Sequence, residues 1–386
     1  MDFSLTEQQR VLKEQIRRFA EKELSPGAAE RDEAHEFSRE LWRKCGAMGL
    51  QGLPVDPAFG GSGADALTTA IGLEALGRGC EDGGLAFAVC AHLLACVVPI
   101  WKHGDSQLKS RYLPGLCDGS LVAVNAMTEP GGGSDAFTMK TRAVADGDHY
   151  IINGAKIFSS NGPVADVAVV YAATAPEKGF MGGITAFLVD AGVPGFKRGQ
   201  TFKKMGLRTC PIGELVFEDV RVPKAQVLGG VGGGGPIFSQ SMEWERICLV
   251  AAHVGAMERL LDLAVDYART RTSFGKKIGH YQAVSHKIAD MKVRLEASRL
   301  LVYRAASMLD ERQSVSLDAS VTKLFVSEAL VQSALDTVQV LGGYGFMSEY
   351  GVERTLRDAV AGTIYSGTSE MQRNIIAKWL GLSSAG

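Results

Sequence analysis

The sequence contains no C-x-x-C pair, no large excess of charge of either sign, and no basic start followed by an apolar run. Its seven cysteines form an odd, scattered set, which argues against a disulfide framework and against a zinc site. Lysine and arginine number 41 against 43 for aspartate and glutamate, so the net charge of -2 gives no global field for nucleic acid. We therefore expect no metal, no nucleic-acid partner, and a reducing, cytoplasmic location.

Long apolar runs are also scarce. The first ten residues, Met1 to Arg10, are acidic and polar where a secretory signal is basic and then apolar, so we expect no targeting segment. One apolar run, residues 85–101, approaches the length of a membrane span but is interrupted by His92 and Pro99. Its shortness and these interruptions favour a buried core helix, and we expect no membrane span.

Three parts of the chain differ in their pattern. At 386 residues with 46% apolar composition, the chain can bury a sizeable core and form two or three structural units. Residues 1–118 show helical spacing, residues 119–228 show short β-rich runs between turn residues, and residues 236–386 return to long helical periodicity. In the first part, a helical segment with apolar residues at Leu12, Ile16 and Phe19 is expected to end at Ser25-Pro26, and further helices are expected at 38–48, 65–77, 85–103 and 106–117. The strands expected in the second part are 121–124, 149–152, 167–171, 185–189 and 214–217. In the third part, a long helix is expected from Gln282 past Leu309, followed by three more helical segments.

A glycine tract, residues 229–235, separates the second part from the third and is expected to be a linker. It contains a formal G-x-G-x-x-G pattern at Gly230, Gly232 and Gly235. The pattern neither lies inside a βαβ unit nor has parallel-sheet patterning around it, so a flexible connector is favoured over a dinucleotide site.

Two segments far apart in the chain, residues 126–135 (AMTEPGGGSD) and 364–373 (IYSGTSEMQR), look like the flavin signatures of the acyl-CoA dehydrogenase family. The order of helical, β and helical parts is similar to that family as well, so the resemblance covers essentially the whole chain. It implies an α+β fold with an N-terminal α-helical domain, a middle β domain and a C-terminal four-helix-bundle domain. It also implies FAD as the cofactor and a homotetramer.

The resemblance further implies which residues contact FAD, some of them across a subunit interface. They are Ala126, Met127, Thr128, Ser134, Phe158, Ser160, Arg271, Phe274, Gln282, Gln339, Gly342, Gly343, Thr368 and Glu370. The commonest family pattern has Trp and Thr where Phe158 and Ser160 stand. Both changes keep the chemistry, because an aromatic face still packs against the ring and a hydroxyl still donates to it. Taken alone, Phe158 has the alternative of being a core residue of a strand.

Ser366 stands where many members of the family carry the glutamate that removes the substrate's α-proton. A serine with no adjacent histidine cannot do this unaided. Glu245 is our candidate for the base, because the isovaleryl-CoA and long-chain enzymes of the family carry theirs at the matching helix position, with a small residue at the Ser366 place. The alternative is that Glu245 is a solvated helix charge paired with Arg246. Glu243, two residues away, is expected to point to another helix face. The backbone N–H of Ser366 is expected to bind the thioester oxygen.

One branch of the family looks most similar: the prolyl carrier protein dehydrogenases of pyrrole biosynthesis and their relatives in natural-product clusters, resembled in residues 84–92, 244–246, 282–286 and 365–369. There the acyl group is attached to the phosphopantetheine of a carrier protein. The expected substrate contacts are Arg246, Ser366, His92 and Ser134, with a core histidine as the alternative for His92.

Three other functions remain open at this point. The chain resembles short or branched acyl-CoA dehydrogenases, which act on CoA esters. Flavin monooxygenases and oxidases share the fold, although the oxidases carry an aspartate at the Ser366 place. A flavin-holding assembly protein would leave Glu245 without a role. The electron acceptor is expected to be an electron-transfer flavoprotein or oxygen.

Overall fold

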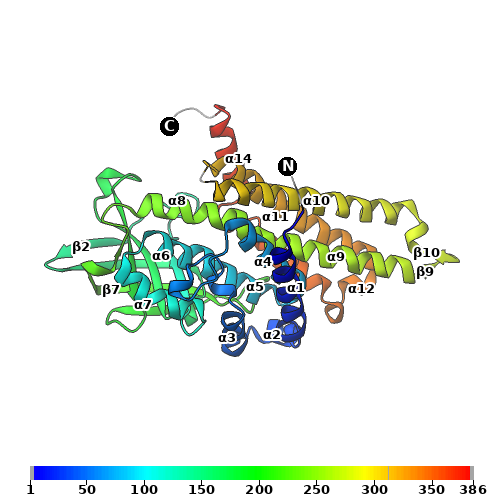
Figure 1. The fold of residues 1–386 in the computed structure, drawn as a ribbon, viewed down its shortest axis with the longest axis horizontal. Coiled ribbons are helices and arrows are strands. Elements are labelled where there is room, and N and C mark those ends of the chain that lie inside the picture. The colour runs from blue at the N-terminus through cyan, green and yellow to red at the C-terminus, as the bar shows by residue number, and fades with distance from the viewer. Residues whose placement is uncertain (1–3, 312, 383–386) are drawn as a thin grey trace.

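The computed structural model describes residues 4–311 and 313–382. The outermost residues of the first and last predicted domains, and the first three residues of the polar start, lie outside the described residues. The described chain forms a helical part, a β part and a second helical part, as predicted from the order of patterns (Figure 1).

The regular structure of the N-terminal part is helical. Its first helix is capped by Thr6, whose hydroxyl accepts from the Gln9 backbone while the Gln9 side chain accepts from the Thr6 backbone. The helices are α1 (Glu7–Phe19), α2 (Ala28–Ala34), α3 (Arg39–Ala47), α4 (Ala66–Gly79), α5 (Gly83–His92), α6 (Val98–His103) and α7 (Ser106–Cys117).

The apolar run predicted to be a core helix lies within a continuous helix, Gly83–His103, in which a π-helical turn (Leu93–Val97) joins α5 to α6. This helix and Ser316–Leu341 are long and apolar enough to cross a membrane, but 83% of the apolar window of the first lies buried inside the structure. It packs as a core helix because its neighbours on several sides are apolar.

The middle part is an eight-stranded sheet with the order β6-β7-β3-β2-β4-β5-β8, and β1 pairs with β4 in parallel. The strands are β1 (Ala123–Ala126), β2 (Arg142–Asp146), β3 (His149–Ser160), β4 (Val167–Ala173), β5 (Ile184–Asp190), β6 (Phe196–Thr201), β7 (Ile212–Pro223) and β8 (Val227–Leu228). The strands β2, β6 and β8 were not predicted. Most residues of β2 and β6 are exposed and show no apolar alternation, and β8 has only two residues.

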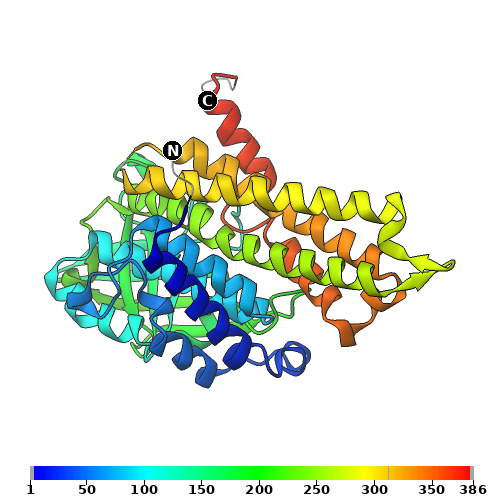
Figure 2. The same ribbon diagram turned by 45° about the vertical axis from the view of Figure 1, so that its right-hand side comes forward.

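The C-terminal part is built on long helices. Its elements are α8 (Gly234–Trp244), a π-helical turn (Glu245–Leu249), α9 (Val250–Thr270), β9 (Thr272–Ser273), β10 (Lys276–Lys277), α10 (Gln282–Asp310), α11 (Ser316–Leu341), α12 (Gly343–Phe346), α13 (Val352–Ala361) and α14 (Ser369–Trp379). Helices α9, α10 and α11 pack together and extend away from the sheet, with the β9–β10 hairpin at their far end (Figure 1). Helix α14 projects from the body of the molecule (Figure 2).

The expected glycine linker is shorter than predicted. Gly234 and Gly235 form the first turn of α8 and are buried. A Cβ atom on Gly235 would lie 2.4 Å from the Phe180 carbonyl oxygen, so the glycine allows the helix to begin against that backbone. The helix therefore starts within the tract rather than after it.

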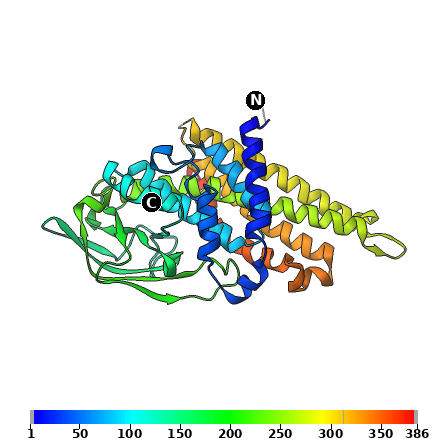
Figure 3. The ribbon, with the colours of Figure 1, turned by 60° about the horizontal axis from the view of Figure 1, so that its bottom comes forward.

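The sheet lies beside the helical parts rather than at a distance from them (Figure 3). The helix Gly83–His103 packs against β1, and the π-helical turn after α8 packs against α4, α5 and α11. This packing brings the end of β1, the middle of the helix 234–270 and the loop before α14 to one place.

Candidate active site

A cavity of about 800 Å³ lies where the three parts meet. Its wall contains side chains from the helix Gly83–His103, from β1 and the segment that follows it, from β3, from α8 with its π-helical turn, and from α14. It brings together eight of the predicted site residues: Met127, Thr128, Ser134, Phe158, Ser160, Glu245, Arg246 and Ser366.

The predicted base lies in this wall. Glu245 is 7% exposed, and its Oε1 accepts a hydrogen bond of 2.5 Å from the Ser366 hydroxyl. It is not the solvated helix charge of the alternative interpretation. Glu243 does not line the cavity, and its Oε1 accepts from the Ser316 hydroxyl at 2.8 Å.

Burial governs the acidity of this carboxyl group. Removal from water raises the pKa of Glu245 above its usual value, and the hydrogen bond from Ser366 and the charges of Arg246 and Lys323 only partly oppose the rise. A carboxylate with a raised pKa is a stronger base than a solvated glutamate, as proton abstraction near neutral pH requires.

Glu245 is the first residue of a π-helical turn within the helix 234–270. Single π turns inside α-helices are rare and occur frequently at functional sites. The turn begins where the helix passes the loop that carries Ser366, and it faces a second π turn, Leu93–Val97, across the core. The two turns therefore shape the same region of the interior.

The loop that holds Ser366 has its carbonyl groups bound on one side. Arg246 Nε donates to the Ser366 carbonyl oxygen at 3.0 Å, and Lys323 Nζ donates to that of Gly367 at 2.7 Å. The side-chain amide of Gln372 donates to both carbonyls. Ser366 has a φ of 55°, a left-handed conformation that is costly for a residue other than glycine.

These contacts leave the loop amides free. Within the part of the chain that the structure describes, the N–H groups of Ser366 and Gly367 donate to no acceptor. An unpaired amide beside a buried carboxylate base is the arrangement that stabilises an oxygen on which negative charge develops.

The segment after β1 is held by a buried ion pair. Lys156 is fully buried, and its Nζ donates to Glu129 Oε1 and to the Met127 carbonyl oxygen, both at 2.9 Å. The Glu129 carboxylate also accepts from the backbone N–H groups of Lys140 and Thr141. This network fixes the path of the chain through Met127 and Thr128 at the edge of the cavity.

Phe158 is not a core residue, since 60% of it is exposed and its ring faces the cavity. Its φ of 55° turns the side chain out of the regular pleat of β3, and Phe202 packs against its ring at 5.7 Å between centroids. With the hydroxyl groups of Thr128 and Ser160 in the same wall, the site offers an aromatic face and polar donors. These residues fit a flat, heteroaromatic ring system such as the flavin of FAD.

Several predicted flavin contacts lie near the cavity without facing it. Ala126 points into the interior of the sheet, so only its backbone is available. Thr368 caps α14 by accepting from the Met371 backbone, and Glu370 is exposed in the first turn of that helix.

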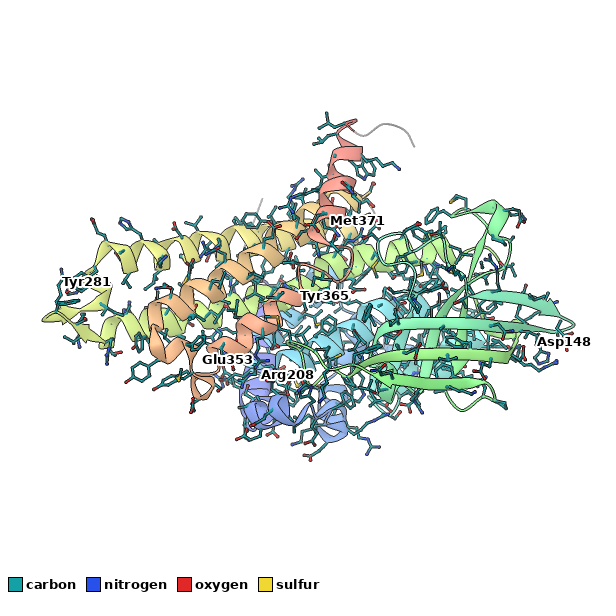
Figure 4. All side chains as sticks on the ribbon, turned by 180° about the vertical axis from the view of Figure 1, so that it is seen from behind. Asp148, Arg208, Tyr281, Glu353, Tyr365 and Met371 are labelled. Atoms are coloured by element: carbon teal, nitrogen blue, oxygen red, sulfur yellow. The ribbon has the colours of Figure 1, made fainter. Side chains whose placement is uncertain are left out.

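A second group of predicted contacts lies far from the cavity. Arg271, Phe274 and Gln282 surround the β9–β10 hairpin, and Phe274 is 94% exposed. Arg271 lies over the ring of Tyr344, which places Gln339, Gly342 and Gly343 at the same end of the molecule. In Figure 4, Tyr281, next to Gln282, lies at the tip of the long helices, whereas Tyr365, next to Ser366, lies near the centre. One chain therefore does not bring both groups to one ligand.

The expectation that His92 contacts the substrate is wrong. His92 is fully buried, its Nε2 lies 3.0 Å from the Leu116 carbonyl oxygen, and its Nδ1 accepts from the Ala123 N–H at 2.9 Å. Since both ring nitrogens are used, it is a core histidine. Burial lowers its pKa to about 4, so the ring is neutral at physiological pH.

Two residues of the site were missed by sequence reasoning. Lys156 looks like an ordinary strand lysine, and only its burial reveals its role. Asn125 lines the cavity from β1. In the sequence, the one feature that points to it is that it is a polar residue inside the apolar run from Leu121 to Met127. No group of histidine, cysteine or acidic side chains suited to a metal ion occurs among the described residues.

The three parts of the chain match the three family models of acyl-CoA dehydrogenases: the N-terminal domain at residues 6–120, the middle domain at 125–220 and the C-terminal domain at 232–381. An L-prolyl-[peptidyl-carrier protein] dehydrogenase of Serratia sp. is 45% identical over 99% of both chains. The solved structure described as PigA with FAD and proline has a TM-score of 0.97 at 45% identity and covers 99% of this chain and 100% of its own. That of the prolyl acyl carrier protein oxidase AnaB has a TM-score of 0.96 at 42% identity and covers 98% and 100%.

Proposed function

Because the chain belongs to the acyl-CoA dehydrogenase family, we propose that it dehydrogenates an acyl thioester with FAD, and that the acyl group is a prolyl or similar group on a carrier protein in natural-product biosynthesis. The observation that carries the first part is the placement of Glu245, a buried carboxylate with a raised pKa, beside the free amides of the Ser366 loop. The second part is supported by the similarity to prolyl carrier protein enzymes.

The chain's own residues supply the proton chemistry. Glu245 takes the α-proton, and the Ser366 N–H binds the thioester oxygen, which gains negative charge as that proton leaves. The apolar part of the wall, including Phe87, Met242 and Tyr365, excludes water from the carboxylate. FAD, when bound against Met127, Thr128, Phe158 and Ser160, supplies the acceptor for the β-hydride.

We further propose that the enzyme is a homo-oligomer, in line with the tetramer that the family resemblance implies. The separation of the two groups of predicted FAD contacts supports this, because Arg271 and Gln282 reach a cofactor only if a second chain presents them. An arginine there suits a pyrophosphate, to which its planar fork gives paired hydrogen bonds. We propose the cytoplasm as its location, in keeping with seven cysteines that are all free and buried.

The experiment that tests this function is anaerobic bleaching of the bound flavin. Prolyl and simple acyl groups loaded on a carrier protein are compared with butyryl-CoA and isovaleryl-CoA. We expect bleaching by the carrier-bound prolyl group. Bleaching by the CoA esters alone would contradict the carrier part and leave an acyl-CoA dehydrogenase. Reoxidation of the bleached enzyme by air or by an electron-transfer flavoprotein then distinguishes the two proposed electron acceptors.

A further inference from the structure

Asn125 lies on β1 with its side chain on the same face as Ala123 and Met127, and all three line the cavity. The alternate residues, Val124 and Ala126, point to the opposite face of the sheet and belong to the apolar core there. Asn125 therefore presents the only amide side chain in the described wall of the cavity.

The amide of Asn125 has no partner. Its Oδ1 is buried without a hydrogen bond, and its Nδ2 donates to no acceptor among the described residues. Two other polar groups of the wall do have partners: the Tyr365 hydroxyl lies 2.7 Å from His253 Nε2, and the Ser316 hydroxyl donates to Glu243. A buried amide oxygen that lacks a hydrogen bond destabilises the protein unless a ligand supplies one.

The surroundings of Asn125 leave room for a ligand. The helix Gly83–His103 packs against β1 and contributes Ala91 and Ala95 to the wall, both with small side chains. Glu245 shares the cavity but is committed to the proton and to Ser366. A second carboxylate would raise the pKa of Glu245 further by repulsion, whereas a neutral amide oxygen accepts an N–H without adding charge.

On these grounds, and resting on the proposed function, we propose that Asn125 determines specificity by accepting a hydrogen bond from a nitrogen in the acyl group. The ligand class is a compact acyl thioester with an N–H next to its α-carbon, as in a saturated five-membered ring amine. The amide turns about its Cβ–Cγ bond so that Oδ1 meets this N–H. An acyl group with a methylene at that place leaves the amide unpaired and binds less well.

The experiment compares a prolyl and a cyclopentanecarbonyl thioester, whose rings differ only in that the first has an N–H where the second has a methylene. Each group is loaded on the carrier protein and is also made as a CoA ester. The readout is kcat/KM for anaerobic flavin reduction by the holoenzyme. The wild type should prefer the prolyl group, and Asn125→Leu should reduce this preference by roughly 10- to 100-fold. Asn153→Leu, the same change at an exposed position of β3, should keep it.

Flavin content and absorption spectrum separate the possible roles of Asn125. They should be the same in Asn125→Leu as in the wild type, and loss of FAD or a shifted spectrum would overturn the inference by assigning Asn125 to the cofactor. A preference that survives in Asn125→Leu, or a wild type that does not discriminate the two rings on either carrier, would also overturn it. Discrimination seen only with the CoA esters would support Asn125 and contradict the carrier part of the proposed function.

Discussion

The Ser366 hydroxyl donates to the carboxylate of Glu245 at 2.5 Å, so the residue that stands in the place of the usual base is bound to the residue that replaces it. The bond favours the ionised form of the carboxylate and lowers a pKa that burial raises. Ser366 therefore helps to keep Glu245 ionised, in addition to offering its own backbone amide.

Replacement of Ser366 by alanine should move the acid limb of the rate profile to higher pH. The reaction needs ionised Glu245, and loss of a donor to the carboxylate raises the pKa of Glu245, so more of the enzyme is protonated at a given pH. At alkaline pH the rate should recover, since the backbone N–H at position 366 remains. The check is the pH dependence of flavin reduction. Ser316→Ala, which breaks the equivalent bond to Glu243, is the matched control, and an equal shift there would refute the interpretation.

Glu245→Gln should retain FAD and lose flavin reduction by substrate by at least about 100-fold, because an amide cannot accept the α-proton. Glu243→Gln should retain reduction, because Glu243 does not line the cavity and its carboxylate is bonded to Ser316. Rapid mixing with substrate under anaerobic conditions measures both variants. Normal turnover by Glu245→Gln would show that another residue is the base.

Glu245→Gln should also stabilise the folded protein at neutral pH. The folded-state pKa of Glu245 lies above its unfolded value, so the ionised form destabilises the fold as the pH rises through that window. An uncharged glutamine removes this effect. Thermal unfolding at pH 7.5 should show a higher Tm than in the wild type, and a Tm equal or lower would count against a desolvated carboxylate at this position.

Lys156→Met should lower the free energy of unfolding by about 3–5 kcal/mol, the usual effect of breaking a buried ion pair. It leaves Glu129 without its cation and frees the Met127 carbonyl, so the flavin-facing segment loses its support. We expect reduced FAD content in the purified protein together with lower urea resistance. Lys197→Met, which removes an exposed pair with Glu218, is the control and should change both by little.

Acid should destabilise the protein partly through His92. Its folded pKa of about 4 lies below the unfolded value of 6.5, so its contribution to stability is complete above pH 6.5 and is lost as the pH falls toward 4. The full loss is at most about 3 kcal/mol. Urea unfolding between pH 4 and 7 should show a shallower pH dependence in His92→Gln than in the wild type, with the exposed His280→Gln as the control.

Much of the fold follows from local patterns. Short β-rich runs between turn residues predicted β4 and β5 and parts of β3 and β7, whose apolar side chains enter a core, and the helix predicted at 106–117 coincides with α7. The strands β2 and β6 were not predicted, because they are stabilised by backbone pairing with β3 and β7 and not by burial of their own side chains.

The site was only partly predictable for a similar reason. Motif resemblance identified Glu245 and Ser366, and the structure places them in hydrogen-bond contact. The roles of Lys156 and Asn125 depend on which neighbours surround them, and those neighbours lie far away in sequence. His92 was misassigned because an apolar helix with one histidine does not reveal which side of the helix faces the cavity.

The cavity wall is divided between segments of the sheet and segments of the C-terminal helices. Asn125 is held by the sheet, whereas Glu245 and Ser366 are held by the C-terminal helices and their loop. Substitutions in β1 can therefore alter the acyl group that is accepted while the proton-abstracting pair keeps its geometry. Duplicated genes for such an enzyme could diverge toward new substrates through intermediates that remain active at every step.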